Sequence, residues 1–148
     1  MEMKNLYDLE VYDGILARIE QLRPVSHPEW GKMNVAQMMA HCAETIDVSN
    51  GKPLKGTPWF LKPFGGIVKK MVVNNKPYPK NLRTHPQYLM TEPEDFVRQK
   101  ERLAFSLKTM IALGRVGSKH PLMGQMTADE KGWGMYKHLD HHLSQFGV

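Results

Sequence analysis

Two histidines near the end of the chain have the spacing of a helical metal-binding pair. His138 and His142 are four positions apart, which on an α-helix corresponds to about 40° of rotation and about 6 Å of rise. Both imidazoles can therefore reach one metal ion. His141 could take the place of His142 in a three-residue spacing, but the four-residue spacing is the commoner chelating geometry in helices. Because such pairs also occur as solvated surface histidines, a third ligand is needed to sharpen the interpretation.

His41 is the candidate for that third ligand. It lies on the apolar face of an expected helix, and this face should point toward the interior of a helical fold. Taken alone, His41 is equally consistent with a core histidine that has a satisfied hydrogen bond. Three other histidines each precede a proline in an expected loop, where turn hydrogen bonds or exposure are the better interpretation: His27, His85 and His120.

Three further side chains near these histidines have weaker support. Glu44, one turn after His41, could orient a ligand imidazole or act as a general base, although a carboxylate at a helix rim is more often solvated. Gln145, one turn after His142, has the same two interpretations. Cys42 is rotated by about 100° from His41 on the helix, so we expect a small buried apolar residue rather than a ligand or a nucleophile.

Four amphipathic helical segments are predicted to carry these residues. Their apolar residues recur at three- and four-residue steps. Asn34 and Thr127 are each followed three residues later by a capping-box partner, Gln37 and Glu130 respectively. Thr91 is the expected cap of the third helix. The predicted helices cover Asp8 to Leu22, Asn34 to about Asn50, Thr91 to Gly114, and Thr127 to about Gln145.

The connections between these helices determine the expected topology. The second and third helices are separated by the long segment Gly51 to Met90, and a link of that length permits a crossover. We therefore expect an all-α fold, a four-helix bundle with up-down-down-up order, formed as a single domain by residues 1–148. The crossover is expected to hold a short helix around Gly66 to Val73.

Composition and charge narrow the class of protein. The chain has 148 residues, of which 41% are apolar and 24% charged, close to globular averages. The net charge of +5 comes from the crossover, which holds eight Lys or Arg and no Asp or Glu. We interpret the crossover as a solvated loop rather than an anion-binding surface. No nucleic-acid motif, signal peptide or membrane span is evident, and the single cysteine is typical of a reducing compartment, so a cytoplasmic protein is expected.

The residues also resemble a known family. The segment Trp30 to His41, followed far downstream by His138-x-x-x-His142-x-x-Gln145, resembles the DinB superfamily of bacterial metalloenzymes. The match spans most of the chain and points to a branch known mainly as a domain of unknown function. The resemblance implies an up-down-down-up bundle in which His41, His138 and His142 hold divalent zinc or nickel.

The expected function follows from the site and the resemblance together. Better-understood members of that superfamily use low-molecular-weight thiols, as S-transferases or thiol-dependent isomerases. Three neutral nitrogen ligands leave at least one position open on a metal, and they suit zinc, nickel, copper or iron(II). The leading hypothesis is a metal-dependent transferase or hydrolase that acts on a small electrophile with thiol or water as nucleophile.

Other functions are kept as alternatives. The first is a non-catalytic helical bundle that binds a metal or a small ligand. A nucleic-acid role comes third, because only the basic crossover and the superfamily's historical link to DNA damage suggest it. A homodimer is expected by analogy alone.

Overall fold

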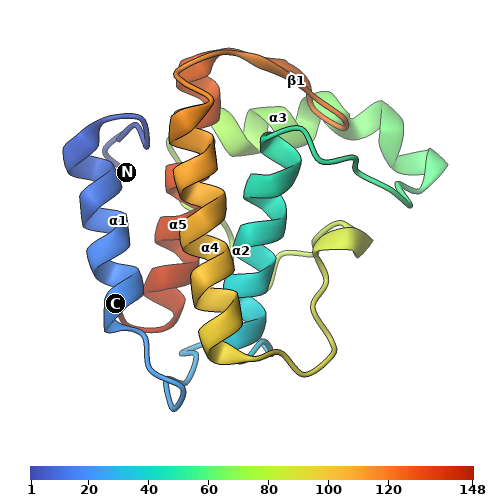
Figure 1. Cartoon of the computed structure of the whole chain (residues 1–148). Helices are drawn as coiled ribbons and strands as arrows, with labels where there is room; N and C mark the ends of the chain where they lie inside the picture. Colours follow the sequence, from blue (N-terminus) through green and yellow to red (C-terminus); the bar gives the residue numbers. More distant parts are fainter.

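The computed structural model describes residues 1–148 (Figure 1). The chain forms five α-helices, two short 3₁₀ helices (Trp59–Phe64 and Pro86–Tyr88) and a two-stranded antiparallel sheet. The α-helices and strands are α1 (Leu9–Gln21), α2 (Val35–Ser49), α3 (Gly65–Val73), α4 (Phe96–Ala112), β1 (Ser118–His120), β2 (Gly124–Met126) and α5 (Ala128–Gln145). None of the helices is both long enough and apolar enough to cross a membrane.

The four longest helices pack side by side and run in two directions. In Figure 1, α1 and α5 descend while α2 and α4 rise. Hydrogen bonds confirm that α2 and α4 run the same way, because Gln37 bonds to the carbonyl of Glu92 near the start of both helices, and Asn50 bonds to the carbonyl of Ser106 farther along both. The segment between α2 and α4 therefore passes from one end of the helices to the other.

The expected fold class, an all-α four-helix bundle, is wrong. The chain has a fifth α-helix and a small antiparallel sheet in which Ser118 pairs with Met126 and His120 with Gly124. The hairpin was missed because three-residue strands are too short to show a period-two pattern. Gly124 has a φ of 74°, a left-handed conformation that suits the residue closing a three-residue hairpin loop.

Local signals explain where the helices begin. The predicted capping boxes at the starts of α2 and α5 are both formed, by Asn34 with Gln37 and by Thr127 with Glu130. The predicted start of α4 at Thr91 is wrong, because α4 begins at Phe96 with Asp95 as its cap. The side chain of Asp95 accepts a hydrogen bond from a backbone amide of the first turn, as the preferred capping residues do.

Apolar faces of the four longest helices meet in one core, which α2 enters most deeply. Fully buried members come from all four helices and include Ile19 on α1, Ile46 on α2, Leu107 on α4 and Leu139 on α5. Twelve of the fifteen residues of α2 are buried. Polar side chains on this helix are therefore removed from water and need partners inside the protein.

The segment between α2 and α4 is fixed to α5 by a buried lysine. Lys137 is 1% exposed, and its Nζ donates hydrogen bonds to the carbonyls of Met71 and Asn74 at the end of α3. Gly134 lets α3 approach, since a Cβ at this position would lie 2.7 Å from a methyl of Val72. The predicted short helix around Gly66 to Val73 is present as α3.

Candidate metal centre

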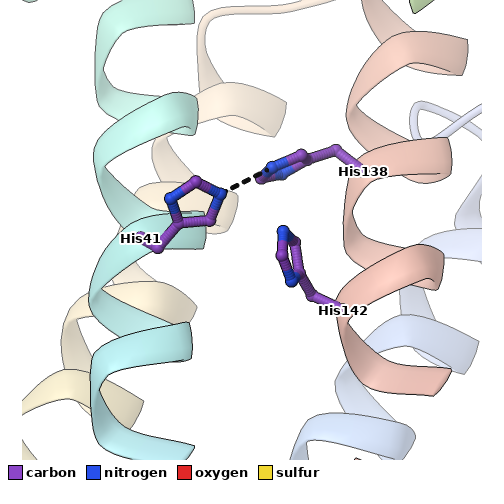
Figure 2. Close-up of side chains that lie close together, drawn as sticks. All are labelled: His41, His138 and His142. Carbon is purple, nitrogen blue, oxygen red and sulfur yellow. Dashed lines mark hydrogen bonds between the residues drawn. The ribbon is translucent and has the colours of Figure 1, made fainter. Parts of the chain in front are cut away.

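Three histidine side chains from α2 and α5 converge between the two helices (Figure 2). His41 on α2 and His142 on α5 are 4% and 8% exposed, and His138 is half-buried. The Nε2 atoms of His41 and His138 are 3.0 Å apart, and one ring nitrogen from each of the three histidines lies within 4.8 Å of the others. The three residues predicted as metal ligands are therefore brought together.

The antiparallel course of α2 and α5 creates this convergence. His138 and His142 lie one turn apart on the inner face of α5, with ring centroids 4.7 Å apart. His41 approaches from α2, and its ring centroid is 4.9 Å from that of His138 and 4.7 Å from that of His142. Residues four apart on a helix share one face, so the spacing in the sequence accounts for the pair on α5, and the packing of α2 adds the third ring.

The outward-facing nitrogen of each ring is held by a hydrogen-bond acceptor. Nδ1 of His41 is 2.7 Å from the carbonyl oxygen of Tyr88, which can only accept, so this nitrogen carries the hydrogen. Nδ1 of His138 is 3.4 Å from the hydroxyl oxygen of Thr45. That hydroxyl already donates its hydrogen to the carbonyl of Cys42, so it accepts from His138.

Gln145 fixes the third ring in the same way. Its side-chain nitrogen donates to the carbonyl of Trp30, at 2.6 Å, and this contact sets the orientation of the amide. The amide oxygen is then left to face Nδ1 of His142 at 2.8 Å. Gln145 thus orients the imidazole of His142, which agrees with one of the two interpretations that the sequence left open.

These bonds determine which nitrogens are free. Because Nδ1 carries the hydrogen in His41 and His142, their Nε2 atoms present lone pairs when the rings are neutral. Nε2 of His138 lies 3.0 Å from Nε2 of His41, in a hydrogen bond that depends on the tautomer of His138 (Figure 2). With the hydrogen of His138 on Nδ1, toward Thr45, all three Nε2 atoms are available to a metal. Burial lowers the pKa of all three histidines, to about 3 for His142 and well below the usual value for His138. At neutral pH the three rings are therefore uncharged.

The arrangement matches the requirements of a divalent metal site. Neutral imidazole nitrogens are common ligands of zinc and nickel, and ligating histidines almost always donate their other ring N–H to a carbonyl, amide or carboxylate. The Nε2 atoms of His41 and His138 are at hydrogen-bond distance, 3.0 Å, and a bound ion would take the place of the hydrogen that they share. The residues present therefore fit such an ion, and three protein ligands leave a fourth position for a water or a substrate.

Aromatic side chains surround the three histidines on the side of the long connection. Tyr78 is half-buried, with its ring centroid 6.5 Å from that of His138 and 5.8 Å from that of His141. Trp30 lies 5.7 Å from His141. His141 is thus placed beside the three-histidine cluster rather than in it. Burial raises the pKa of Tyr78, so its hydroxyl keeps its proton at neutral pH.

Glu44 does not take part in the cluster. Its carboxylate accepts hydrogen bonds from Lys52, from Gln87 and, at short range, from Arg102. Burial raises the pKa of Glu44, but these donors outweigh that effect and leave it below the usual value. Glu44 is therefore an ionised partner of a charge cluster between α2 and α4, and its contacts give no support to the catalytic role expected from the sequence.

The other residues considered in the sequence lie outside the cluster. Cys42 is buried with its sulfur against that of Met38, and burial raises the pKa of its thiol, so it stays protonated. His85 and His120 each accept backbone N–H bonds in local turns through Nδ1, and His27 is exposed. These are the turn contacts and exposure expected from their place before prolines.

Three groups that position the histidines were not identified from the sequence. The carbonyl of Tyr88 and the hydroxyl of Thr45 contact His41 and His138, and the carbonyl of Trp30 accepts from Gln145. Thr45 lies one turn after His41 on the same helical face, and that spacing was a usable signal. The carbonyls belong to segments without regular periodicity, and any residue type can supply a carbonyl. No residue pattern could have indicated them.

Comparison with known proteins gives the family without an activity. No curated protein and no solved structure matches the chain. A family model described as "Protein of unknown function (DUF1569)" matches residues 2–147, nearly the full length, and so covers all three clustered histidines. The chain therefore belongs to the DUF1569 family of proteins of unknown function.

Proposed function

We propose that the protein is a divalent-metal-dependent enzyme, a transferase or hydrolase that acts on a small electrophile. In this proposal His41, His138 and His142 hold zinc or nickel through Nε2, and a thiol or a water is the nucleophile. The observation that carries it is the convergence of three neutral imidazoles, each with one ring nitrogen within 4.8 Å of the others and the opposite nitrogen next to a hydrogen-bond acceptor. The resemblance to the DinB superfamily supports the same ligands and suggests a low-molecular-weight thiol.

A bound ion of this kind polarises an electrophile and activates a thiol or water at neutral pH. The protein's part is to fix the geometry. Tyr88, Thr45 and Gln145 hold the three rings by their Nδ1 atoms, so little reorganisation is needed on binding. Tyr78 places a protonated hydroxyl group and an aromatic ring next to His138 and His141, where it can shield the site from water.

One observation favours the alternative, a non-catalytic protein that binds a metal or a small ligand. General base catalysis needs a carboxylate or a neutral imidazole within reach of the nucleophile. Glu44 is fully engaged with cations and an amide, which leaves only His141 next to the cluster. Because a site can hold an ion whether or not it has a base, metal binding and turnover must be measured separately.

The first test is metal binding by protein without an affinity tag. Elemental analysis of the purified protein, followed by calorimetric titration of the chelated protein with Zn²⁺ and Ni²⁺, should give one ion per chain. The His142→Ala variant should lose this site, and His27→Ala, which removes an exposed histidine, should retain it. Equal binding by His142→Ala and wild type would refute the proposed ligands.

The second test is turnover. The metal-loaded and chelated proteins are compared for conjugation of glutathione, cysteine or bacillithiol to 1-chloro-2,4-dinitrobenzene, and for hydrolysis of p-nitrophenyl acetate. We expect a rate that requires both the ion and His142. A protein that binds one ion at the three histidines but accelerates neither reaction, over a panel of thiols and esters, would favour the non-catalytic alternative.

A further inference from the structure

A cavity lies at the C-terminal end of α2, away from the three histidines. It has a volume of about 220 Å³ and is bounded by the end of α2, the end of α4, β1 and the first turn of α5. That volume exceeds the roughly 30 Å³ that one water occupies in the liquid, so a small solute fits. The lining contains no Asp or Glu, while it includes Lys119 and Lys131.

Lys131 is the unusual member of this lining. Only 4% of the residue is exposed. Its ammonium group belongs to none of the ion pairs of the chain. Fully buried lysines are rare unless they are paired, and Lys137 illustrates the usual solution, with three hydrogen bonds to its Nζ. Lys131 has no such acceptors, and burial lowers its pKa.

The surroundings favour an anion over a cation. Helix ends such as that of α2 carry a negative partial charge on their last carbonyls. Here the carbonyls of Ile46, Asp47 and Val48 are already occupied by backbone amides of the following turn. The hydroxyls of Ser49 and Ser118 add donors to the lining. His120 adds another, because its Nδ1 accepts two backbone amides and leaves the hydrogen on Nε2.

We propose that this cavity binds a small oxyanion, with hydrogen phosphate as the simplest member of the class. The anionic oxygens accept hydrogen bonds from Lys131. The cavity is separate from the three-histidine cluster. Lys131 and His138 are seven residues apart on α5, which at 1.5 Å per residue is about 10 Å along the helix.

Calorimetric titration of the full-length, chelated protein with inorganic phosphate tests the proposal. Chelation is needed because phosphate can also bind a metal held by the histidines. We expect Lys131→Met to weaken phosphate binding by roughly 10- to 100-fold, the usual loss for a charged hydrogen-bond donor, and Lys131→Arg to restore most of it. Lys108→Met, which removes an exposed lysine of α4 outside the cavity, is the matched control and should bind as wild type.

Sulfate is a second oxyanion probe. Its oxygens can accept from Lys131 in the same way, so we expect Lys131→Met to weaken sulfate binding by a similar factor. Absence of phosphate binding, or equal binding by wild type and Lys131→Met, would overturn the site itself.

A second substitution keeps the test decisive if Lys131→Met does not fold. Val116 lines the cavity but is 53% exposed, so Val116→Glu introduces a carboxylate with little effect on the core. Repulsion should weaken phosphate binding at least about tenfold. Val97→Glu, on the exposed side of α4 at its other end, should leave it unchanged. Equal binding by both variants would contradict the proposal.

Discussion

Two polar clusters on α2 differ in how their atoms are satisfied. Glu44 accepts three hydrogen bonds from side chains of this chain, and its neighbour Asp47 is held by Arg102 and Ser106. The cluster around His41 is the opposite case. Its outer nitrogens contact acceptors of the chain, whereas its inner nitrogens contact only one another. Charges that are paired within the chain indicate a structural role, whereas the cluster of neutral imidazoles is the one that we propose to hold a cation.

The difference between the Glu44 cluster and the histidine cluster is tested most strongly by removing one ring of the histidine cluster. His41→Ala, His138→Ala and His142→Ala should each weaken Zn²⁺ binding by more than about 100-fold, because two imidazoles remain. An ion that binds only the folded state stabilises it. Chelation should therefore lower the thermal unfolding midpoint of the wild-type protein and leave the midpoints of these variants unchanged. Competition with a fluorescent zinc chelator measures the affinity.

Substitutions in the Glu44 cluster provide the control for that experiment. Arg102→Met should bind Zn²⁺ with wild-type affinity. Loss of metal binding by this variant would show that the two clusters are not independent, and the distinction between a structural and a ligand-binding cluster would then fail.

The residue that orients His142 is expected to have the next largest effect. Gln145→Leu removes the acceptor for Nδ1, so it should weaken Zn²⁺ binding by roughly 10- to 100-fold. Gln145→Glu keeps an acceptor oxygen for Nδ1 but loses the donor to the carbonyl of Trp30, so it should bind less tightly than wild type but more tightly than Gln145→Leu. Isothermal titration of both variants measures the difference. If the two variants bind alike, the contact at 2.8 Å does not orient the ring.

The Glu44 cluster should affect stability rather than metal binding. Glu44→Gln leaves Lys52 without its ionised partner and leaves Arg102 paired with Asp47 alone. We expect a loss of roughly 1–3 kcal/mol in the free energy of unfolding, since Arg102 is partly solvated and the full cost of a buried unpaired charge is not reached. Urea denaturation of chelated protein measures this loss. A change below about 0.5 kcal/mol would mean that the cluster is a solvated surface feature.

The same cluster predicts the direction of a pH effect. Its donors hold the pKa of Glu44 below the ordinary value of 4.5. A carboxyl group with a lowered folded-state pKa contributes stability above its unfolded pKa, and that contribution is lost as the pH falls through the folded value. The stability of the wild-type protein should therefore fall more steeply below about pH 4.5 than that of Glu44→Gln. Parallel curves from urea titrations at several pH values would contradict this.

The smallest effect is expected in the basic segment between α2 and α4. The sequence predicted that its lysines point to solvent. Lys70 is exposed and Lys70→Ala should change the free energy of unfolding by about 0.5 kcal/mol or less. Lys52 and Lys69 depart from that expectation because they pair with Glu44 and Glu130. Lys52→Ala should therefore cost more than Lys70→Ala in urea denaturation.

The sequence allowed the helices and the three histidines to be predicted because both depend on local spacing. The capping boxes at Asn34 and Thr127 and the His138–His142 pair are recognised from spacings of three and four residues. A helix brings residues at these spacings together. The small sheet, the pairing of Glu44 and the unpaired Lys131 depend on contacts between distant segments. Periodicity in a single sequence does not reveal contacts between distant segments. For this reason the all-α expectation was wrong and the partners of Glu44 were not predicted.

The most direct test of the central claim is a crystal structure of the protein grown with Zn²⁺, with anomalous diffraction recorded on both sides of the zinc edge. We expect one strong anomalous peak about 2.0–2.1 Å from Nε2 of His41, His138 and His142, the usual zinc–nitrogen distance. Nδ1 of each ring should remain bonded to its present partner. No peak between α2 and α5 at saturating zinc, or a peak bound by other residues, would contradict the account.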